Sequence, residues 1–401
     1  DLSAVRNWIA QGIVPLLTGL PSYRATLERM RGLSSQQEAE APLPSMSLGL
    51  PHSARAMVVA ALQEDWPAPI LLVTDRPERS RDYYDQLQVW SSRPERIVSF
   101  PAPDTLFYDR PPWDRTVSQA RVQVLTALGQ ARSAAGAQPT VILAPAWALM
   151  QKTVPPLALR RATHTIAVGS VIPLHQVLTQ LVRAGYEAAI VVEEPGTFSH
   201  RGSLVDVFPA GAPAPVRIDL FGDEVDSIRQ IDAATQRSGE RLDRVSLPPA
   251  HEALPEWGKA AAAQLAALDL TSCNSQTHSR LSEEIELIAG GGSPAGFEFY
   301  LPYLYPRAST LLDHLPSGSL VLLDDLTAIQ SAMAALERQA EGLRADLVRD
   351  GDLPERWAVP YHTAAHLSER LGAYGAVSLG YGQVDTNQPL GSLFSPPHGY
   401  G

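Results

Sequence analysis

The sequence predicts a parallel-sheet α/β domain that is interrupted by an inserted α+β domain with an antiparallel sheet. Short, continuous apolar runs alternate with helical segments before residue 152 and again near residue 320. This alternation is typical of a parallel sheet that helices cover on both faces. Between residues 153 and 248, strand-like runs follow one another directly and are separated by glycine turns, which is typical of antiparallel strands.

The elements before residue 152 begin with a helical N-terminal segment. Residues 1–30 have the apolar spacing of an amphipathic helix and residues 33–44 form a polar linker, so we group 1–44 as one segment. The first part of the α/β domain then spans residues 45–152. Residues 49–62 are predicted to form a turn and then a helix, and 78–90 and 117–134 are further predicted helices. The predicted buried strands are 70–74, 96–100 and 141–144.

The inserted domain, residues 153–248, is predicted to hold one helix and a series of strands. The helix is 174–184, and the strands are 188–192, 204–208, 216–221 and 227–231. Residues 249–379 then return to the α/β domain and add accessory helices. Their clearest elements are the apolar strand 319–323 and the long helix 326–348, and residues 380–401 have the Gly, Pro and Ser content of a linker.

Composition excludes several classes of protein. With 45% hydrophobic and 19% charged residues the chain is ordinary globular material, and no apolar run is long enough to span a bilayer. The single cysteine, Cys273, excludes an internal disulfide framework and indicates a cytoplasmic protein. The net charge of -11 makes DNA a poor main partner, because surfaces that bind phosphates are usually basic. All but two of the 32 basic residues are arginines, which fits protein interfaces and equally fits a genomic composition bias.

The first turn of the α/β domain lies where a nucleotide-binding protein carries its phosphate-binding loop. A working loop, G-x-x-x-x-G-K-[ST], holds phosphates with backbone amides, neutralises them with its lysine and binds Mg²⁺ through its hydroxyl. Residues 47–55 instead read S-L-G-L-P-H-S-A-R, in which Pro51 removes an amide and Arg55 stands in the lysine region. We therefore interpret Gly49, Ser53 and Arg55 as the start of a plain helix, with residual nucleotide binding as the alternative.

A second relic of a nucleotide site follows the last apolar strand. Asp324 and Asp325 stand where ATPases place a Mg²⁺-binding Asp and a water-polarising Glu. Because strands often end in acids and no intact phosphate loop exists, we predict neither a catalytic nor a metal site. Cys273 has no paired histidine nearby in sequence, so it is not expected to be a nucleophile. His362 and His366 lack the glutamate and third ligand of a zinc site, so both are expected to be solvated.

The most informative stretch is 196–229, in which strand 216–221 alternates strictly. Arg217 and Asp219 share one face of this strand, and Phe221 points to the same side, away from the core. An aromatic residue beside arginine on an exposed sheet face has the composition of a protein-binding hot spot. An Arg–Asp pair within the sheet, with an incidental Phe, is the alternative interpretation. The residues predicted to face the core are Val216, Ile218 and Leu220.

The same stretch closely resembles a signature shared by UvrB and the transcription-repair coupling factor (Mfd) family. The matching residues read G-T-F-S-H-R-G-S-L-V-D-V-F-P from Gly196 and R-I-D-L-F-G-D-E-V-D-S-I-R from Arg217. The likeness extends over residues 45–379. The degenerate phosphate loop, and the lack of a Tyr-rich hairpin between Phe100 and Val117, resemble the coupling factor rather than UvrB.

This resemblance implies a degenerate RecA-like (P-loop NTPase-like) α/β domain that is split by an inserted domain which binds UvrA. Carried over by position in the signature, the contact residues fall on Arg201, Arg217 and Phe221. The implied function is a UvrA-recruiting module in transcription-coupled nucleotide excision repair, without catalytic activity or a cofactor of its own. The alternatives are a UvrB-type nucleotide-dependent repair enzyme with residual ATPase activity through Asp324, and a DNA-clamping module.

The resemblance also implies a longer protein. The full-length factor is expected to be an ATP-dependent DNA translocase that uses ATP and Mg²⁺ to displace stalled RNA polymerase from double-stranded DNA. Nothing in these 401 residues matches a polymerase-binding domain or a motor, so the chain is interpreted as an N-terminal fragment. In the family the UvrA-binding face is masked by the C-terminal part, so recruitment is expected to be gated.

Overall fold

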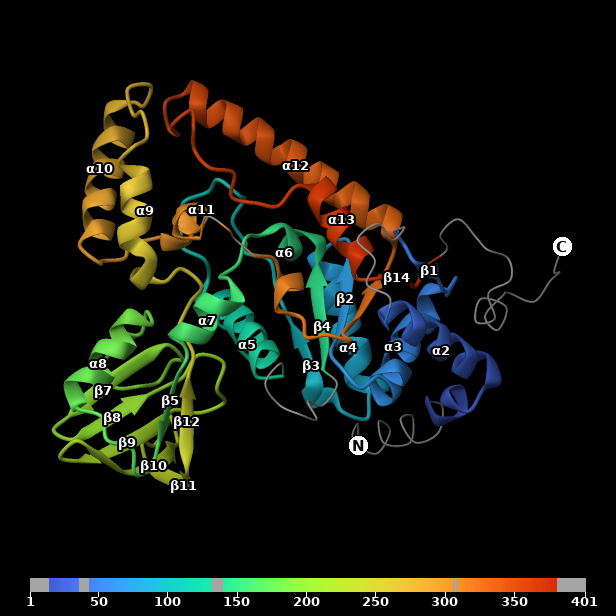
Figure 1. Cartoon of the computed structure of the whole chain (residues 1–401), viewed down its shortest axis with the longest axis horizontal. Coiled ribbons are helices and arrows are strands. Elements are labelled where there is room, and N and C mark those ends of the chain that lie inside the picture. Colours follow the sequence, from blue (N-terminus) through green and yellow to red (C-terminus); the bar gives the residue numbers. More distant parts are fainter. Residues whose placement is uncertain (1–13, 36–42, 132–139, 306, 308, 381–401) are drawn as a thin grey trace.

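The computed structural model describes residues 14–35, 43–131, 140–305, 307 and 309–380 (Figure 1). Its first sheet has six strands in the order β1-β14-β13-β2-β4-β3, and every pairing between them is parallel. These strands are β1 (Met46–Ser47), β2 (Ile70–Thr74), β3 (Ile97–Ser99), β4 (Val141–Pro145), β13 (Leu320–Leu323) and β14 (Val377–Ser378).

Four of these strands, β2, β3, β4 and β13, are those predicted from short apolar runs. All of β2 (I-L-L-V-T) is buried, because both faces of the sheet are covered. Its side chains alternate between two hydrophobic cores, with Ile70 and Leu72 in one and Leu71 and Val73 in the other. The two-residue strands β1 and β14 carry too little pattern to be predicted.

Helices on both faces of the sheet give three layers. One face holds α2 (Pro21–Ser35), α3 (His52–Asp65) and α4 (Pro77–Trp90). The other face holds α5 (Arg115–Ala131), α6 (Ala146–Met150), α12 (Leu326–Arg349) and α13 (Ala364–Ala373). The predicted fold class, a parallel-sheet α/β domain with a separate antiparallel sheet, is confirmed.

The N-terminal helix differs from its prediction. The apolar spacing predicts one helix over residues 1–30, but the helix that includes residue 14 ends before residue 20 and α2 begins at Pro21. Proline has no N–H and collides with the preceding turn, so it starts a helix more readily than it continues one. Residues 1–13, most of the predicted linker 33–44, and the predicted linker beyond residue 380 lie outside the described residues.

Further helices complete the α/β domain. They are α7 (Pro156–Ala162), α9 (Gly258–Leu265), α10 (Ser275–Ala289) and α11 (Leu301–Leu304), with 3₁₀ turns η1 (Pro94–Arg96), η2 (Pro255–Trp257), η3 (Phe297–Tyr300) and η4 (Leu311–His314). Helices α9 and α10 lie side by side (Figure 1) and bury Leu265, Leu281 and Ile288 in the core that also contains α5 and α12. Among the described helices, none is long and apolar enough to cross a membrane.

The inserted domain contains a six-stranded sheet in the order β11-β10-β9-β8-β7-β6. All of its pairings are antiparallel except that between β6 and β7. The strands are β6 (Glu187–Ala188), β7 (Thr197–Arg201), β8 (Leu204–Val207), β9 (Val216–Phe221), β10 (Glu224–Ile231) and β11 (Ser238–Leu242). A separate antiparallel ribbon of β5 (His164–Ala167) and β12 (Arg244–Leu247) carries the chain into and out of the domain.

Helix α8 (Leu174–Arg183) covers one face of this sheet. Its apolar side chains Val177 and Leu181 are four residues apart, so they share one side of the helix and pack on the strands. In Figure 1, α8 lies above the sheet, on the side nearer the α/β domain. Within the described part of the chain no helix covers the opposite face, which is therefore open.

The chain passes from one hydrophobic core to the other slightly later in the sequence than the predicted domain boundaries of 153 and 248. Helix α7 still belongs to the core of the α/β domain through Ala158 and Ala162, whereas Ile166 belongs to the core of the inserted domain. At the other end, Ala250 packs in the inserted domain and Ala253 in the α/β domain.

Candidate protein-binding face and degenerate nucleotide site

The open face of the inserted sheet carries the side chains that the sequence singled out. Along β9, exposed or half-buried Arg217, Asp219 and Phe221 alternate with the buried side chains of the core face. The alternation predicted for this strand is therefore confirmed. Its cause is the two-residue period of a strand, which directs successive side chains to opposite faces.

Phe221 is a large apolar side chain of this face that is 83% exposed. It ends β9 immediately before the turn at Gly222, whose φ of 64° suits glycine. Single exposed apolar residues are common, but an aromatic ring this exposed adds little to the folded core. Its position beside charged groups on an uncovered sheet therefore makes it a candidate contact for another protein.

Arg217 is held in a fixed orientation by Asp206 on the neighbouring strand. Its Nε donates to Oδ1 at 2.7 Å and its Nη2 donates to Oδ2 at 2.8 Å, so the pair is bidentate. The two residues face each other in the register of β8 and β9. The Arg–Asp pair left open by the sequence is thus present, with Asp206 as the acid, while Asp219 accepts a hydrogen bond from Ser203 at 3.3 Å.

Arg201 lies at the end of β7, on the same open face. Its strand register places it opposite Leu204, which in turn lies opposite Asp219 on β9. Its Nη2 donates to the carbonyl of Ile190 at 3.2 Å, and its side chain is exposed. Arg217 and Phe221 lie on β9, and Arg201 lies two strands away on β7 at the level of Asp219. Because neighbouring strands are about 5 Å apart, the three side chains lie close together on one surface.

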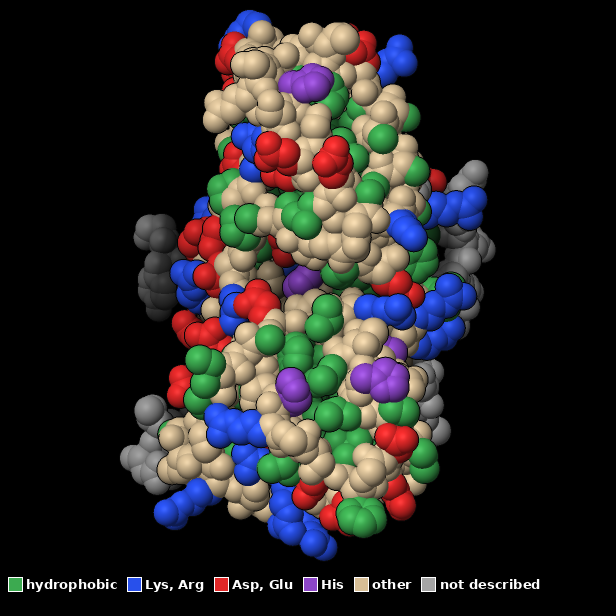
Figure 2. Space-filling model, turned by 90° about the vertical axis from the view of Figure 1, so that its left-hand side faces the viewer, with side chains coloured by type: hydrophobic (Ala, Val, Ile, Leu, Met, Phe, Trp, Pro, Cys, Tyr) green, Lys and Arg blue, Asp and Glu red, His purple; other side chains and the backbone are tan. Residues whose placement is uncertain are grey.

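The molecular surface carries both signs of charge. Figure 2 shows the molecule from the left-hand side of Figure 1, with red and blue side chains interspersed over both domains. On this side the basic groups do not form one continuous patch. A mixed surface of this kind suits a protein partner better than a phosphate backbone.

The degenerate phosphate loop is tied back onto the α/β domain. Gly49 adopts a positive φ of 63°, and its amide donates to the carbonyl of Gly380 at 3.3 Å. Helix α3 then starts after Pro51, which supplies no side-chain cap, and Ser53 is exposed in its first turn. Arg55 follows on the same helix and points into the protein.

Arg55 and Asp324 form a buried ion pair. Arg55 is 2% exposed and Asp324 is 3% exposed. The Nη1 of Arg55 donates to Asp324 Oδ1 at 2.6 Å and to its backbone carbonyl at 3.0 Å, while Nε donates to the Leu50 carbonyl at 3.1 Å. The residue in the lysine region of the lost loop therefore contacts the acid that would bind Mg²⁺ in an ATPase.

Two further groups from α4 saturate the same carboxylate. Arg79 Nε donates to Asp324 Oδ2 at 2.8 Å, and the Tyr83 hydroxyl donates to Oδ1 at 2.5 Å. Burial alone would raise the pKa of Asp324, but hydrogen bonds from Arg79, Tyr83 and Arg55 outweigh it and hold the pKa below its usual value. Asp325 has a different partner, because its side chain caps α12 by accepting from the Ala328 amide at 3.0 Å.

The remaining candidates do not assemble a site. His362 and His366 stack with 5.4 Å between ring centroids, but no group of three metal-ligating side chains occurs among the described residues. His366 is exposed as predicted, whereas His362 is partly buried and its pKa is lowered to about 4 mainly by that burial. Burial and the neighbouring Asp269 and Asp352 raise the pKa of the Cys273 thiol, which opposes its use as a nucleophile.

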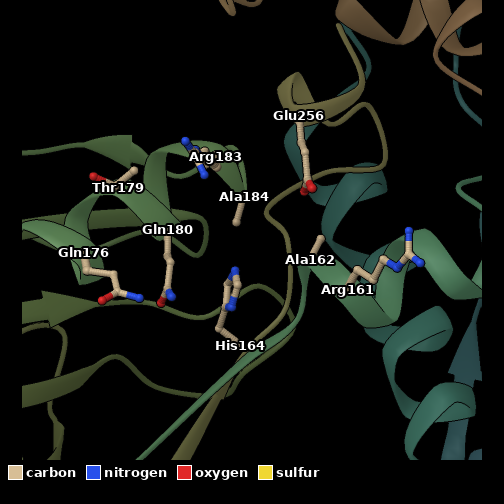
Figure 3. Close-up of a pocket in the computed structure, with 9 residues that line it drawn as sticks. All are labelled: Arg161, Ala162, His164, Gln176, Thr179, Gln180, Arg183, Ala184 and Glu256. Carbon is tan, nitrogen blue, oxygen red and sulfur yellow. The ribbon is translucent and has the colours of Figure 1, made fainter. Parts of the chain in front are cut away.

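Two hollows mark the junction of the domains. The smaller, of about 210 Å³, lies between α7, α8 and η2, and in Figure 3 the His164 ring and the Glu256 carboxylate both point toward it. The larger, of about 410 Å³, is lined by Trp113, His251 and Glu298 among others. Their linings mix arginine, histidine and carboxylate side chains, so neither concentrates the charge of one sign that would select an ionic ligand.

The sequence missed the partners that define both regions. Asp206 stands in L-V-D-V, whose alternation places it on the open face, so its pairing with Arg217 required only the register of β8 against β9. Arg79 and Tyr83 lie more than 240 residues from Asp324 in sequence. No local pattern connects them, because their contact depends on α4 packing beside the carboxyl end of β13.

The geometry of the inserted domain agrees with a comparison to known families. Residues 165–252 match the model described as UvrB interaction domain. The inserted domain is therefore similar to this family over nearly its full length. The match begins within β5 and ends soon after β12, so it includes the whole open sheet.

Most of the chain is similar to transcription-repair coupling factors, as the signature predicted. It is 27% identical to the transcription-repair-coupling factor of Bacillus subtilis over 317 residues, which is 76% of this chain and 26% of the relative. The corresponding protein of Myxococcus xanthus is 31% identical over 287 residues, 69% of this chain and 24% of the relative. That of Mycobacterium bovis is 29% identical over 381 residues, 92% of this chain and 29% of the relative. The chain thus spans about a quarter of the length of these relatives.

Proposed function

We propose that this chain is the UvrA-recruiting module of a transcription-repair coupling factor and acts in transcription-coupled nucleotide excision repair. The observation that carries the proposal is the open sheet face of a UvrB interaction domain, on which Phe221 is exposed beside Arg201 and Arg217. The names of the relatives support the repair pathway. The place of action is then the bacterial cytoplasm.

The face is suited to tight binding for two physical reasons. Burying an exposed Phe side chain contributes about 1.5–3 kcal/mol, and Phe221 has nearly all of its surface available. Arg217 is already oriented by Asp206, so less side-chain entropy is lost when a partner docks against it. Aromatic and arginine side chains are the residue types that dominate protein-binding hot spots.

The module itself is proposed to be catalytically inert and to need no cofactor. Arg55 and Arg79 already neutralise Asp324, so a Mg²⁺–nucleotide complex would have to displace two arginines from a buried carboxylate. ATP and Mg²⁺ would instead serve a DNA-translocating motor elsewhere in the full-length factor. RNA polymerase and double-stranded DNA would bind other parts, and one of those parts would mask the UvrA-binding face until recruitment.

The proposal is tested by calorimetric titration of the chain with purified UvrA. Wild type should bind, and Phe221→Ala should weaken binding by about 30-fold or more, the loss typical of a hot spot. Val182→Ala is a matched control, because Val182 is exposed on α8, which covers the opposite side of the sheet. Equal affinities for wild type, Phe221→Ala and Val182→Ala would reject the site, and no binding by wild type would reject the function.

A further inference from the structure

We infer that the docking face continues past Phe221 to Val171, and that these two apolar residues flank the exposed carboxylate of Glu224. We call this row of Phe221, Glu224 and Val171 the knob. The knob would enter a groove on UvrA that is apolar at two points and carries a lysine or arginine side chain between them. This inference rests on the proposed function and adds to it a second apolar contact and the charge of the partner's surface.

The backbone register places Phe221, Glu224 and Val171 in one line across three segments. Phe221 lies opposite Glu224 in the β9–β10 pair, and Glu224 lies opposite Val171 in an isolated antiparallel bridge. Directly opposed residues of antiparallel segments direct their side chains to the same face. Val171 therefore shares the open face with Phe221, although 50 positions of sequence separate them.

Burial supports this orientation. Val171 is 75% exposed, whereas the next residue, Ile172, packs against the core of the inserted domain. On the other strands of the line, Leu220 and Val225 pair with each other and are buried on the core face. In each of the three segments the residue on this line is exposed and its neighbour faces the core. The exposed side chains of the three segments therefore lie on one face.

The segment that carries Val171 is firmly attached to β10. The Ile172 amide donates to the Asp223 carbonyl at 2.7 Å, and the Val225 amide donates to the Ser170 carbonyl at 2.9 Å. A third bond joins the Gly169 amide to the Val225 carbonyl at 2.8 Å. The knob is therefore held in place before any partner arrives, which reduces the entropy lost on binding.

The charges at the knob determine the chemistry of the partner. Glu224 is exposed between the two apolar residues and Asp223 is exposed in the adjoining turn, and within the described residues neither has an arginine or lysine at ion-pair distance. Arg201 and Arg217 lie on the other side of Phe221 together with Asp206 and Asp219, so the face is acidic at the knob and mixed in charge farther along the sheet. A complementary partner therefore presents a cation where it meets Glu224 and apolar surface on both sides of it.

The inference is tested with two Val→Glu substitutions of matched chemistry. Val171→Glu places a charge in the proposed knob, and Val182→Glu places the same charge at a valine of 58% exposure on α8. We expect Val171→Glu to weaken UvrA binding by about 30-fold or more, as at a hot spot, and Val182→Glu to leave it within twofold. Val171→Thr, which keeps the β-branched shape, should weaken binding about fivefold through loss of apolar contact.

The acidic centre of the knob has its own test. Glu224→Arg should weaken binding about tenfold at low salt, and the loss should shrink at high salt because it arises from repulsion between exposed charges. Circular dichroism and melting temperature confirm that each variant folds. If Phe221→Ala disrupts binding while Val171→Glu and Glu224→Arg behave like Val182→Glu, the inference is wrong and the proposed function stands. If wild type does not bind UvrA, both are wrong.

Discussion

Arg55 and Asp324 lie 269 positions apart in sequence, yet the guanidinium of one is 2.6 Å from the carboxylate of the other in the interior of the α/β domain. In a working ATPase the corresponding region would hold a lysine for the phosphates and an acid for Mg²⁺. Here Arg55 and Asp324 neutralise each other. Their ion pair links α3 to the carboxyl end of β13.

This link predicts a large loss of stability when one partner is removed. Arg55→Met keeps most of the side-chain volume but leaves a buried carboxylate with a single arginine, Arg79, and we expect the free energy of unfolding to fall by about 3 kcal/mol. Urea denaturation measures the change. Arg76→Met is the control, because Arg76 is exposed and its ion pair with Asp75 is long, at 4.0 Å. Equally small losses for both variants would show that the buried pair contributes little.

Removing both charges should cost less than removing one. In Arg55→Met/Asp324→Leu no uncompensated carboxylate remains, so part of the stability lost in the single variant should return. The same urea denaturation series measures it. An additive loss would indicate that the two residues act independently.

Nucleotide should not stabilise the chain. A ligand present at 100 times its dissociation constant raises the free energy of unfolding by about 2.7 kcal/mol, and we expect no such shift in melting temperature with millimolar Mg-ATP. Mg²⁺ alone is the control for salt effects. A reproducible upward shift that needs both ATP and Mg²⁺ would instead support the UvrB-type enzyme with residual ATPase activity.

Asp206 should act on UvrA binding through Arg217. Asp206→Asn weakens the bidentate pair, so Arg217 loses its fixed orientation and affinity should fall by about threefold to tenfold, less than for Arg217→Ala. Adding Asp206→Asn to Arg217→Ala should then have almost no further effect. Calorimetric titration of UvrA with wild type, the two single variants and the double variant measures this coupling. Tighter binding by Asp206→Asn would mean that Asp206 competes with the partner for Arg217.

Stability should fall in mildly acidic solution because of His362. Its pKa is lowered to about 4 by burial, while an unfolded histidine has a pKa of about 6.5. Between these values the unfolded chain takes up a proton that the folded chain refuses, so the free energy of unfolding decreases as pH falls from 6.5 to 4 and is unaffected above 6.5.

Urea denaturation at pH 7.5 and pH 5 measures this effect. His362→Gln should reduce the difference between the two pH values, whereas His366→Gln, at the exposed neighbour of the stacked pair, should leave it unchanged. If both variants keep the full difference, the pH dependence comes from other groups, such as His52 and His164, whose pKa values are also lowered by burial.

The sequence predicted the central strands and the two faces of β9 because those features depend on local pattern. A continuous apolar run such as I-L-L-V-T indicates burial on both sides, and the alternation of Arg217, Ile218 and Asp219 indicates burial on one. The break before Pro21 was missed because the apolar spacing on either side of it looks continuous. The strands β1 and β14 were missed because two residues have no period.

Contacts between distant segments could not be predicted in this way. Which acid pairs with Arg217 depends on the register of β8, and which groups surround Asp324 depends on how α4 packs against β13. The exposed state of Val171 depends on a single bridge to Glu224. The residues of the proposed UvrA-binding face were carried over from a family signature, and their role stays a prediction until it is measured.

The ribbon of β5 and β12 brings the two ends of the inserted domain together. His164 and Leu247 lie opposite each other in its register, so the chain enters and leaves at points about 5 Å apart. A short turn can close a gap of that width, so the inserted domain could be removed without breaking any strand of the host sheet. Such a module can be exchanged or duplicated as one piece without rearranging the strands of the host α/β domain.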